Sequence, residues 1–128
     1  MASSPSGAVL NWVIRLRTAD EVFTTAITVA EILYGIELLP IGKRRDKLGG
    51  DAEEMFAEDY SGQVLVFDEA AARAFARIAS SRRRTGRPIA ELDAQIAAIA
   101  SVHDAALATR NTADFEGCGI RLVNPWVD

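Results

Sequence analysis

The chain has 128 residues, of which 49% are hydrophobic and 25% are charged. This is the composition of a single folded domain, and it excludes a disordered polypeptide. With 14 Lys and Arg against 18 Asp and Glu, the formal net charge of -4 argues against a protein that coats nucleic acid through bulk positive charge. The single cysteine, Cys118, cannot form an internal disulfide, so we expect one cytoplasmic domain over residues 1–128.

The N-terminal stretch contains no targeting or membrane-spanning signal. Residues 1–7 are turn-like, and we expect them to be mobile. The apolar run from Ala8 to Leu16 is interrupted by Asn11 and Arg15 and is too short to span a bilayer. Its apolar side chains recur at helical spacing and predict an amphipathic helix with one apolar face, formed by Val9, Trp12, Val13 and Leu16.

Strand-like and helix-like stretches alternate along the rest of the chain. β-Branched, aromatic and other apolar runs predict strands at residues 21–27, 63–67, 106–109 and 120–123. Helices are predicted at residues 28–39, 43–59, 69–84 and 89–103. Asp68 is placed to cap the third of these helices. Alternation of strands with helices predicts an α/β fold in which a parallel sheet is covered by helices.

Three acidic residues stand out because they follow strands or begin helices. Glu31 follows the first predicted strand, on a helix that is otherwise apolar in its first turns. Asp93 begins the alanine-rich helix, and Asp114 follows the strand that ends at Thr109. Ligands of an open α/β sheet bind at the carboxyl ends of its strands, where these three side chains could meet.

A shared metal site is one interpretation of these carboxylates. Converging carboxylates repel each other and raise each other's pKa unless a cation lies between them. Oxygen ligands with few imidazole or thiol groups available favour Mg²⁺ or Mn²⁺ over zinc, and such a site suits phosphodiester hydrolysis. A structural interpretation stays open, because the helix dipole favours Glu31 and Asp93 in first turns and Asp114 can stabilise a turn.

Basic residues gather in two clusters. They are Lys43, Arg44, Arg45 and Lys47 in the first cluster and Arg73, Arg77, Arg82, Arg83, Arg84 and Arg87 in the second. Solvated helix faces explain many such runs, but beside a metal site they would supply positive charge for a phosphate backbone. The lone His103 has no candidate nucleophile near it, and Cys118 lacks a histidine at motif spacing, so neither predicts catalysis.

Four segments, in this order, carry a family resemblance: ITVAEILYGIELLPIGKRRDKL, VLVFDEAAARAFARI, GRPIAELDAQIAAIA and ALATRNTADFEGCGIRLVNPW. They closely resemble the PIN-domain toxins of the VapC type, in the FitB-like branch, from about Ala8 to Trp126. The resemblance implies a three-layer sandwich with a parallel sheet flanked by helices. It implies a Mg²⁺- or Mn²⁺-dependent endoribonuclease that is the toxin of a type II toxin–antitoxin system. It further implies a small antitoxin partner, an RNA substrate, a homodimer and a toxin–antitoxin hetero-oligomer.

The resemblance also assigns roles to individual residues. The family's metal-binding and catalytic carboxylates fall on Glu31, Asp93 and Asp114. Supporting polar residues fall beside them on Thr28, Thr109 and Asn111, where hydroxyl and amide groups can orient metal ligands. The RNA backbone would be guided by a set of basic side chains, namely Arg110, Arg82, Arg83, Arg84, Arg87, Lys43 and Arg44.

The sequence departs from the family at its beginning. These toxins open with a hydrophobic strand that ends in Asp-Thr-Asn and supplies the first metal carboxylate, whereas here no acidic residue precedes Asp20. Since that strand is central in the family, we expect the central N-terminal strand to be missing, which would leave unpaired backbone groups. The alternatives are a start assigned too late, or a shortened PIN module that binds an antitoxin without cleaving RNA. A DNA-directed nuclease of the same fold is a third alternative.

Overall fold

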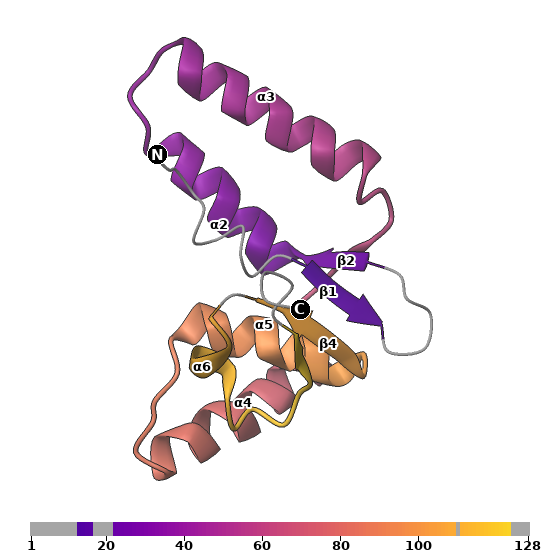
Figure 1. The fold of residues 1–128 in the computed structure, drawn as a ribbon, viewed down its shortest axis with the longest axis vertical. Coiled ribbons are helices and arrows are strands. Elements are labelled where there is room, and N and C mark those ends of the chain that lie inside the picture. The colour runs from indigo at the N-terminus through magenta and orange to yellow at the C-terminus, as the bar shows by residue number, and fades with distance from the viewer. Residues whose placement is uncertain (1–12, 17–21, 110, 124–128) are drawn as a thin grey trace.

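The computed structural model describes residues 13–16, 22–109 and 111–123 (Figure 1). The strands are β1 (Val13–Leu16), β2 (Val22–Thr25), β3 (Val64–Leu65), β4 (Ala105–Ala108) and β5 (Leu122–Val123). The helices are α2 (Ala26–Glu37), α3 (Lys43–Glu58), α4 (Glu69–Arg84), α5 (Glu91–Val102) and α6 (Thr112–Phe115). No described helix is both long enough and apolar enough to cross a membrane.

The five strands form one sheet in the order β3-β2-β1-β4-β5. β2 pairs in parallel with β3, and β4 pairs in parallel with β5. β1 lies between β2 and β4 and runs antiparallel to both. The predicted α/β class is therefore confirmed, with the difference that the sheet is mixed rather than parallel throughout.

The centre of the sheet, which we expected to lack a strand, is occupied by β1. This strand is in register with all four residues of β4 and with two residues of β2. The prediction of a helix over residues 8–16 is therefore wrong for residues 13–16, while residues 8–12 lie outside the described part of the chain. The reason is non-local, because pairing with β1 satisfies backbone groups of both β2 and β4 that would otherwise face a gap.

Helix α2 begins two residues earlier than the sequence pattern predicts. Thr25 has an extended backbone, and its Oγ1 accepts a hydrogen bond from the backbone N–H of Thr28 at 2.9 Å. This side chain caps the helix, so the strand expected at residues 21–27 ends at Thr25. The helix then buries Thr28, Ile32 and Ile36 on one face.

Helix α4 confirms its prediction residue for residue. Asp68 caps it, since its Oδ1 accepts a hydrogen bond from the backbone N–H of Ala71 at 3.0 Å. Gly86 follows the helix with a φ of +77°, a left-handed conformation that favours glycine. The other predicted elements are present, and each of their ends lies within two residues of the predicted end.

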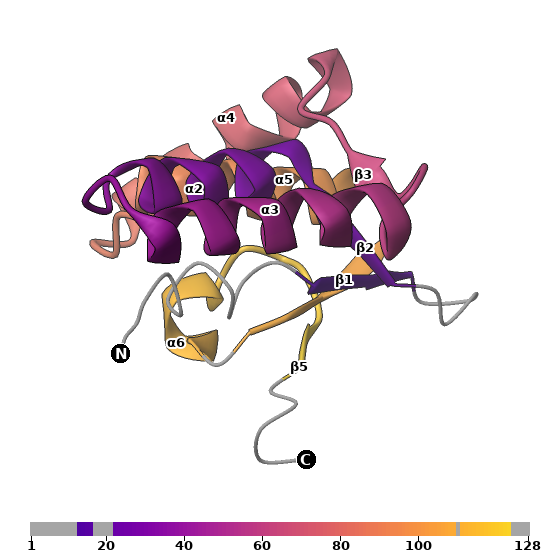
Figure 2. The same ribbon diagram turned by 90° about the horizontal axis from the view of Figure 1, so that it is seen from above.

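The described residues form two apolar clusters. The larger joins α4, α5, β4 and α6 through Ala74, Ile96, Ile99, Leu107 and Phe115, each of which is almost fully buried. The smaller joins α2 to α3 through Ile32, Ile36 and Ala52. Figure 2 shows α2 to α5 gathered on one side of β1. Phe115 of α6 packs in the same cluster as residues of α4 and α5. The short helix α6 is thus carried by the larger cluster.

Candidate active site

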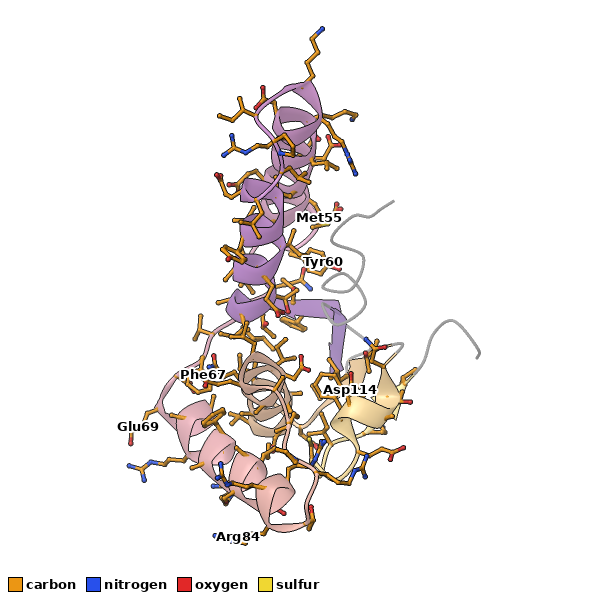
Figure 3. All side chains as sticks on the ribbon, turned by 90° about the vertical axis from the view of Figure 1, so that its left-hand side faces the viewer. Met55, Tyr60, Phe67, Glu69, Arg84 and Asp114 are labelled. Atoms are coloured by element: carbon orange, nitrogen blue, oxygen red, sulfur yellow. The ribbon has the colours of Figure 1, made fainter. Side chains whose placement is uncertain are left out.

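Three different helices carry the three predicted carboxylates. Glu31 lies in the second turn of α2 and Asp93 in the first turn of α5, and both side chains are half-buried. Asp114 lies on α6 and is exposed (Figure 3). The residues are separated by 62 and 21 positions along the chain, so only the tertiary fold can bring them together.

Asp93 interacts electrostatically with each of the other two carboxylates. Burial raises the pKa of Glu31, and the carboxylate of Asp93 raises it further. Burial likewise raises the pKa of Asp93, and the carboxylate of Asp114 adds to that shift. Asp93 is therefore the middle member of the group. Folding brings these like charges near each other, and their repulsion lowers the stability of the folded protein.

One oxygen of this group has an unsatisfied environment. Oε1 of Glu31 is buried and has no hydrogen-bond partner among the described residues. A buried carboxylate oxygen without a donor is costly unless a proton or a cation compensates it. Carboxylate oxygens are the ligands that hard divalent cations such as Mg²⁺ or Mn²⁺ prefer, so the chemistry of these donors fits such an ion.

The carboxylates do not form a closed ligand cage. Within the described part of the chain, no three His, Cys, Asp or Glu side chains lie close enough to hold a metal ion directly. Asp93 and Asp114 instead line one open pocket of about 170 Å³, together with Arg82 and residues 88–90. Mg²⁺ keeps several bound waters and needs only one or two protein carboxylates, so an open site of this kind suits it.

The predicted supporting residues are already engaged in local hydrogen bonds. Thr28 is fully buried, and its hydroxyl lies 3.0 Å from the hydroxyl of Thr25 at the start of α2. Thr109 is also fully buried, and its Oγ1 accepts a hydrogen bond from the backbone N–H of Asn111 at 3.0 Å. The backbone carbonyl of Asn111 in turn accepts from the N–H of Asp114 at 3.0 Å. These bonds shape the backbone on which Glu31 and Asp114 stand.

Arg82 requires a correction, because it does not offer its charge to a ligand at the surface. Its side chain is on the buried face of α4, with 6% exposure. Its guanidinium donates to the backbone carbonyls of Arg87, Asp114 and Glu116 at 2.6, 2.8 and 3.0 Å. A buried charge with these partners is part of the fold, so the prediction that Arg82 contacts RNA is wrong.

The remaining basic residues lie at different distances from the carboxylates. Arg87 is exposed, and its Nη2 donates to the carbonyl of Ala113 at 3.2 Å and to Oε1 of Glu116 at 3.5 Å. Arg83 lines a groove that shares residues 88 and 89 with the carboxylate pocket. Arg84, in contrast, lies at the outer tip of α4, well away from Asp114 in Figure 3.

The first basic cluster lies outside the site. Lys43 and Arg44 begin α3, at the end of the α2–α3 pair that is farthest from α5 and α6 in Figure 1. Both side chains are exposed. Arg110, the basic residue nearest to Asp114 in sequence among those predicted, lies outside the described residues. Among the described residues of the predicted basic set, Arg83 and Arg87 are therefore the exposed side chains close to the pocket, whose wall also includes the buried Arg82.

The role of Arg82 was missed by sequence reasoning, although a signal was present. Residues Ala71, Ala74, Ile78 and Arg82 recur three or four positions apart and form the buried face of α4. An arginine in phase with an apolar stripe is expected to point inward. The run of three arginines that begins at Arg82 masked this phase and suggested a uniformly solvated helix end.

The raised pKa values predict a pH dependence of stability. In the unfolded chain, Glu31 and Asp93 lose their protons near their ordinary pKa values of 4.5 and 3.8, whereas in the folded, metal-free protein their pKa values are higher. At a pH between the ordinary and the raised pKa values, the folded protein therefore holds more protons than the unfolded chain. The free energy of unfolding therefore falls as the pH rises through this interval. We expect urea titrations in EDTA to show a larger decrease in the free energy of unfolding for the wild type than for Asp93→Asn as the pH rises above these ordinary pKa values. Equal decreases for both proteins would contradict the coupling.

Comparison with known proteins gives the family. The model of the PIN domain matches residues 4–117. The VapC ribonuclease Y4jK of Sinorhizobium fredii is 36% identical over 124 residues, which cover 97% of this chain and 88% of that protein. The toxin FitB of Neisseria gonorrhoeae is also 36% identical over 124 residues, with the same coverage, 97% of this chain and 88% of FitB.

Solved structures agree with the sequence comparison. The crystal structure of FitAcB from Neisseria gonorrhoeae is similar with a TM-score of 0.76 and 38% identity, covering 81% of this chain and 75% of the other. VapBC-5 of Mycobacterium tuberculosis, a member of the VapBC family of toxin-antitoxin systems, is similar with a TM-score of 0.68 and 25% identity, covering 80% of each chain. Fold, sequence and family model lead to one conclusion, which is that this chain belongs to the PIN-domain family and is related to its VapC and FitB members.

Proposed function

We propose that this chain is the toxin of a toxin–antitoxin pair and a divalent-metal-dependent endoribonuclease. The observation that carries the proposal is the proximity of Asp93 to both Glu31 and Asp114: the three come from different helices, burial and Asp93 raise the pKa of Glu31, and burial and Asp114 raise the pKa of Asp93. Such a group repels itself unless a cation is bound, so its presence in a folded domain points to metal binding. The relationship to a VapC ribonuclease supports RNA as the substrate.

Each side chain near the pocket has a separate role in the proposed metal and RNA binding. Asp93 and Asp114 would hold Mg²⁺ or Mn²⁺ at the rim of their shared pocket, and Glu31 would approach it from α2 through its unpartnered Oε1. A bound divalent cation supplies an activated water and neutralises charge on the scissile phosphate. Arg83 and Arg87 lie near the pocket and would align the flanking phosphates of the RNA.

A small antitoxin is the proposed protein partner. Its docking surface would include exposed apolar side chains at the end of α2, because Tyr34 is 66% and Leu38 is 68% exposed. Ile41, in the following loop, is 90% exposed. Large apolar side chains grouped in this way are typical of an interaction surface. The relationship to a VapBC toxin–antitoxin system supports this partner, and a homodimer and a toxin–antitoxin hetero-oligomer are proposed with it.

A module that binds an antitoxin without cleaving RNA is the competing function. The observation that favours it is the open arrangement of the acidic group, in which no three side chains among the described residues can ligate one ion together. Under this alternative the carboxylates would lack the geometry for catalysis, while the apolar surface of α2 would still bind its partner.

Cleavage assays with the purified chain distinguish the two functions. If the chain is the proposed endoribonuclease, we expect it to cut a mixture of structured and single-stranded RNAs in Mg²⁺ or Mn²⁺ and to leave them intact in EDTA. DNA of the same sequences should stay intact in both conditions. Titration calorimetry with Mn²⁺ on the same sample reports metal binding separately from turnover. Metal binding without cleavage would favour the binding module, and cleavage of DNA alone would favour a DNA-directed nuclease.

A further inference from the structure

Arg82 stands at the junction of three segments that build the carboxylate site. It lies in the last turn of α4. Its Nε donates to the carbonyl of Arg87, in the turn that leads to α5, at 2.6 Å. Its Nη1 donates to the carbonyls of Asp114 and Glu116 at 2.8 and 3.0 Å. Both lie in residues 112–118, which comprise α6 and the turn after it and are called the α6 segment below. One side chain therefore binds the turn that leads to the helix of Asp93 and the backbone of Asp114 itself.

The partners of Arg82 are unusual for a buried arginine. Within the described part of the chain, its guanidinium makes no ion pair with a carboxylate, and its remaining contact is with Sγ of Cys118 at 3.5 Å. A buried guanidinium needs partners for its donors, and here backbone carbonyls accept from its Nε and Nη1. The backbone around the site therefore fixes the orientation of this planar group. The group in turn holds that backbone in place.

Helix α6 depends on such donors from outside. It contains only four residues, so the carbonyls at its end have no partners within a longer helix. Those of Asp114 and Glu116 are satisfied by Arg82, and that of Ala113 also accepts from Arg87 at 3.2 Å. The chain leaves the helix at Gly117, with a φ of +81°, where an added Cβ would contact Cδ of Arg82 at 3.5 Å. The α6 segment is thus folded closely around this one side chain.

We propose that Arg82 is a positioning residue, whose buried guanidinium holds the α6 segment against the start of α5 so that Asp114 and Asp93 face one shared cation. The inference rests on the proposed function, in which these carboxylates bind a divalent metal. Arg82 lines the same pocket as both carboxylates but makes its hydrogen bonds to backbone groups. It acts on the metal through the placement of Asp114, like the outer-shell groups that orient metal ligands.

The sign of the effect on metal affinity separates positioning from simple charge. If Arg82 acted only as a nearby positive charge, its removal would relieve repulsion and strengthen binding of a cation. If it positions Asp114, its removal weakens binding, and a lysine cannot replace it, because one ammonium group does not reproduce a fork of donors to separate carbonyls. If only charge matters, Arg82→Met binds the cation more tightly and Arg82→Lys, which keeps the charge, binds it as the wild type does. If Arg82 positions Asp114, both variants bind the cation more weakly.

The experiment measures Mn²⁺ affinity by titration calorimetry and backbone protection by hydrogen exchange in EDTA. Arg82→Met and Arg82→Lys are each expected to lower Mn²⁺ affinity by about 10- to 100-fold. In both variants the amides of Asp114, Glu116 and Cys118 should exchange faster, while those of α5 keep their protection. Arg77→Met removes the same charge from an exposed position of the same helix, away from the proposed metal and RNA contacts, and it should change neither measurement.

A double-mutant cycle completes the test. In an Asp114→Asn background, Arg82→Lys should weaken Mn²⁺ binding little further, because its effect passes through Asp114. Unchanged exchange in the α6 segment, or an affinity for Mn²⁺ that is unchanged or higher in Arg82→Met, would overturn the inference. If the wild type binds no Mn²⁺, the proposed function fails, and the metal-free exchange data still decide whether Arg82 holds the α6 segment.

Discussion

Asp93→Asn is expected to abolish metal-dependent RNA cleavage and, at the same time, to stabilise the metal-free protein. Asp93 is the middle carboxylate of the site, since it raises the pKa of Glu31 and its own pKa is raised by Asp114. Loss of an outer-shell partner alone costs about 10- to 100-fold in metal affinity or activity, so loss of this central carboxylate should cost at least about 100-fold. Asparagine keeps the shape of the side chain and removes the repulsion, which accounts for the gain in stability.

Cleavage rate in Mg²⁺ and the free energy of unfolding in EDTA measure the two effects. Glu91→Gln is the matched control, because it removes one carboxylate from the same first turn of α5 at an exposed position. This control should leave the cleavage rate close to that of the wild type. Full activity of Asp93→Asn would refute the assignment of the site, and a less stable metal-free variant would refute the proposed repulsion.

Phe115→Ala is expected to cause the largest loss of stability among the predicted variants. Phe115 is 1% exposed and is a large, fully buried side chain packed in the core shared by α4, α5 and β4. Removal of a buried phenylalanine side chain typically costs about 3–5 kcal/mol, including the cavity that remains. Against a total stability of about 5–15 kcal/mol for a domain, this loss should leave a marginally folded protein.

Chemical denaturation at pH 7 measures this effect. Phe115→Leu should cost clearly less, since leucine retains much of the buried apolar volume. Ile41→Ala removes apolar atoms from a side chain that is 90% exposed and should change the free energy of unfolding by less than about 0.5 kcal/mol. If Phe115→Ala unfolds at the same denaturant concentration as the wild type, α6 is not held by the larger core.

The sequence predicted an element correctly where the interactions that determine its ends lie between neighbouring residues. Both ends of helix α4 are determined by adjacent residues, the N-cap Asp68 at its start and Gly86 just after its end. The structure confirms both ends and the cap. The start of α2 was displaced by two residues because Thr25, in a strand-like run, also caps a helix. A cap and a strand end have similar backbone conformations, so composition alone does not separate them.

Non-local interactions account for the main errors. Residues 13–16 have helical spacing of apolar side chains, yet they form β1 because two neighbouring strands offer unpaired backbone groups on both sides. Arg82 belongs to a run of arginines that is typical of a solvated helix end, yet two of its three carbonyl partners, Asp114 and Glu116, lie 32 and 34 residues away. No local pattern contains those partners, although the phase of the apolar stripe indicated the buried position.

The sequence by itself determined the α/β class, the helices and the identity of the three acidic residues, because helix periodicity, capping and family motifs are properties of short segments. The tertiary structure alone decided that Asp93 lies near both Glu31 and Asp114, and that burial and these neighbours raise the pKa values of Glu31 and Asp93. It also decided that β1 fills the centre of the sheet and that Arg82 holds the backbone of the site. Coupling between charges and satisfaction of buried polar groups depend on distances in space, and these exist only after distant segments have packed together.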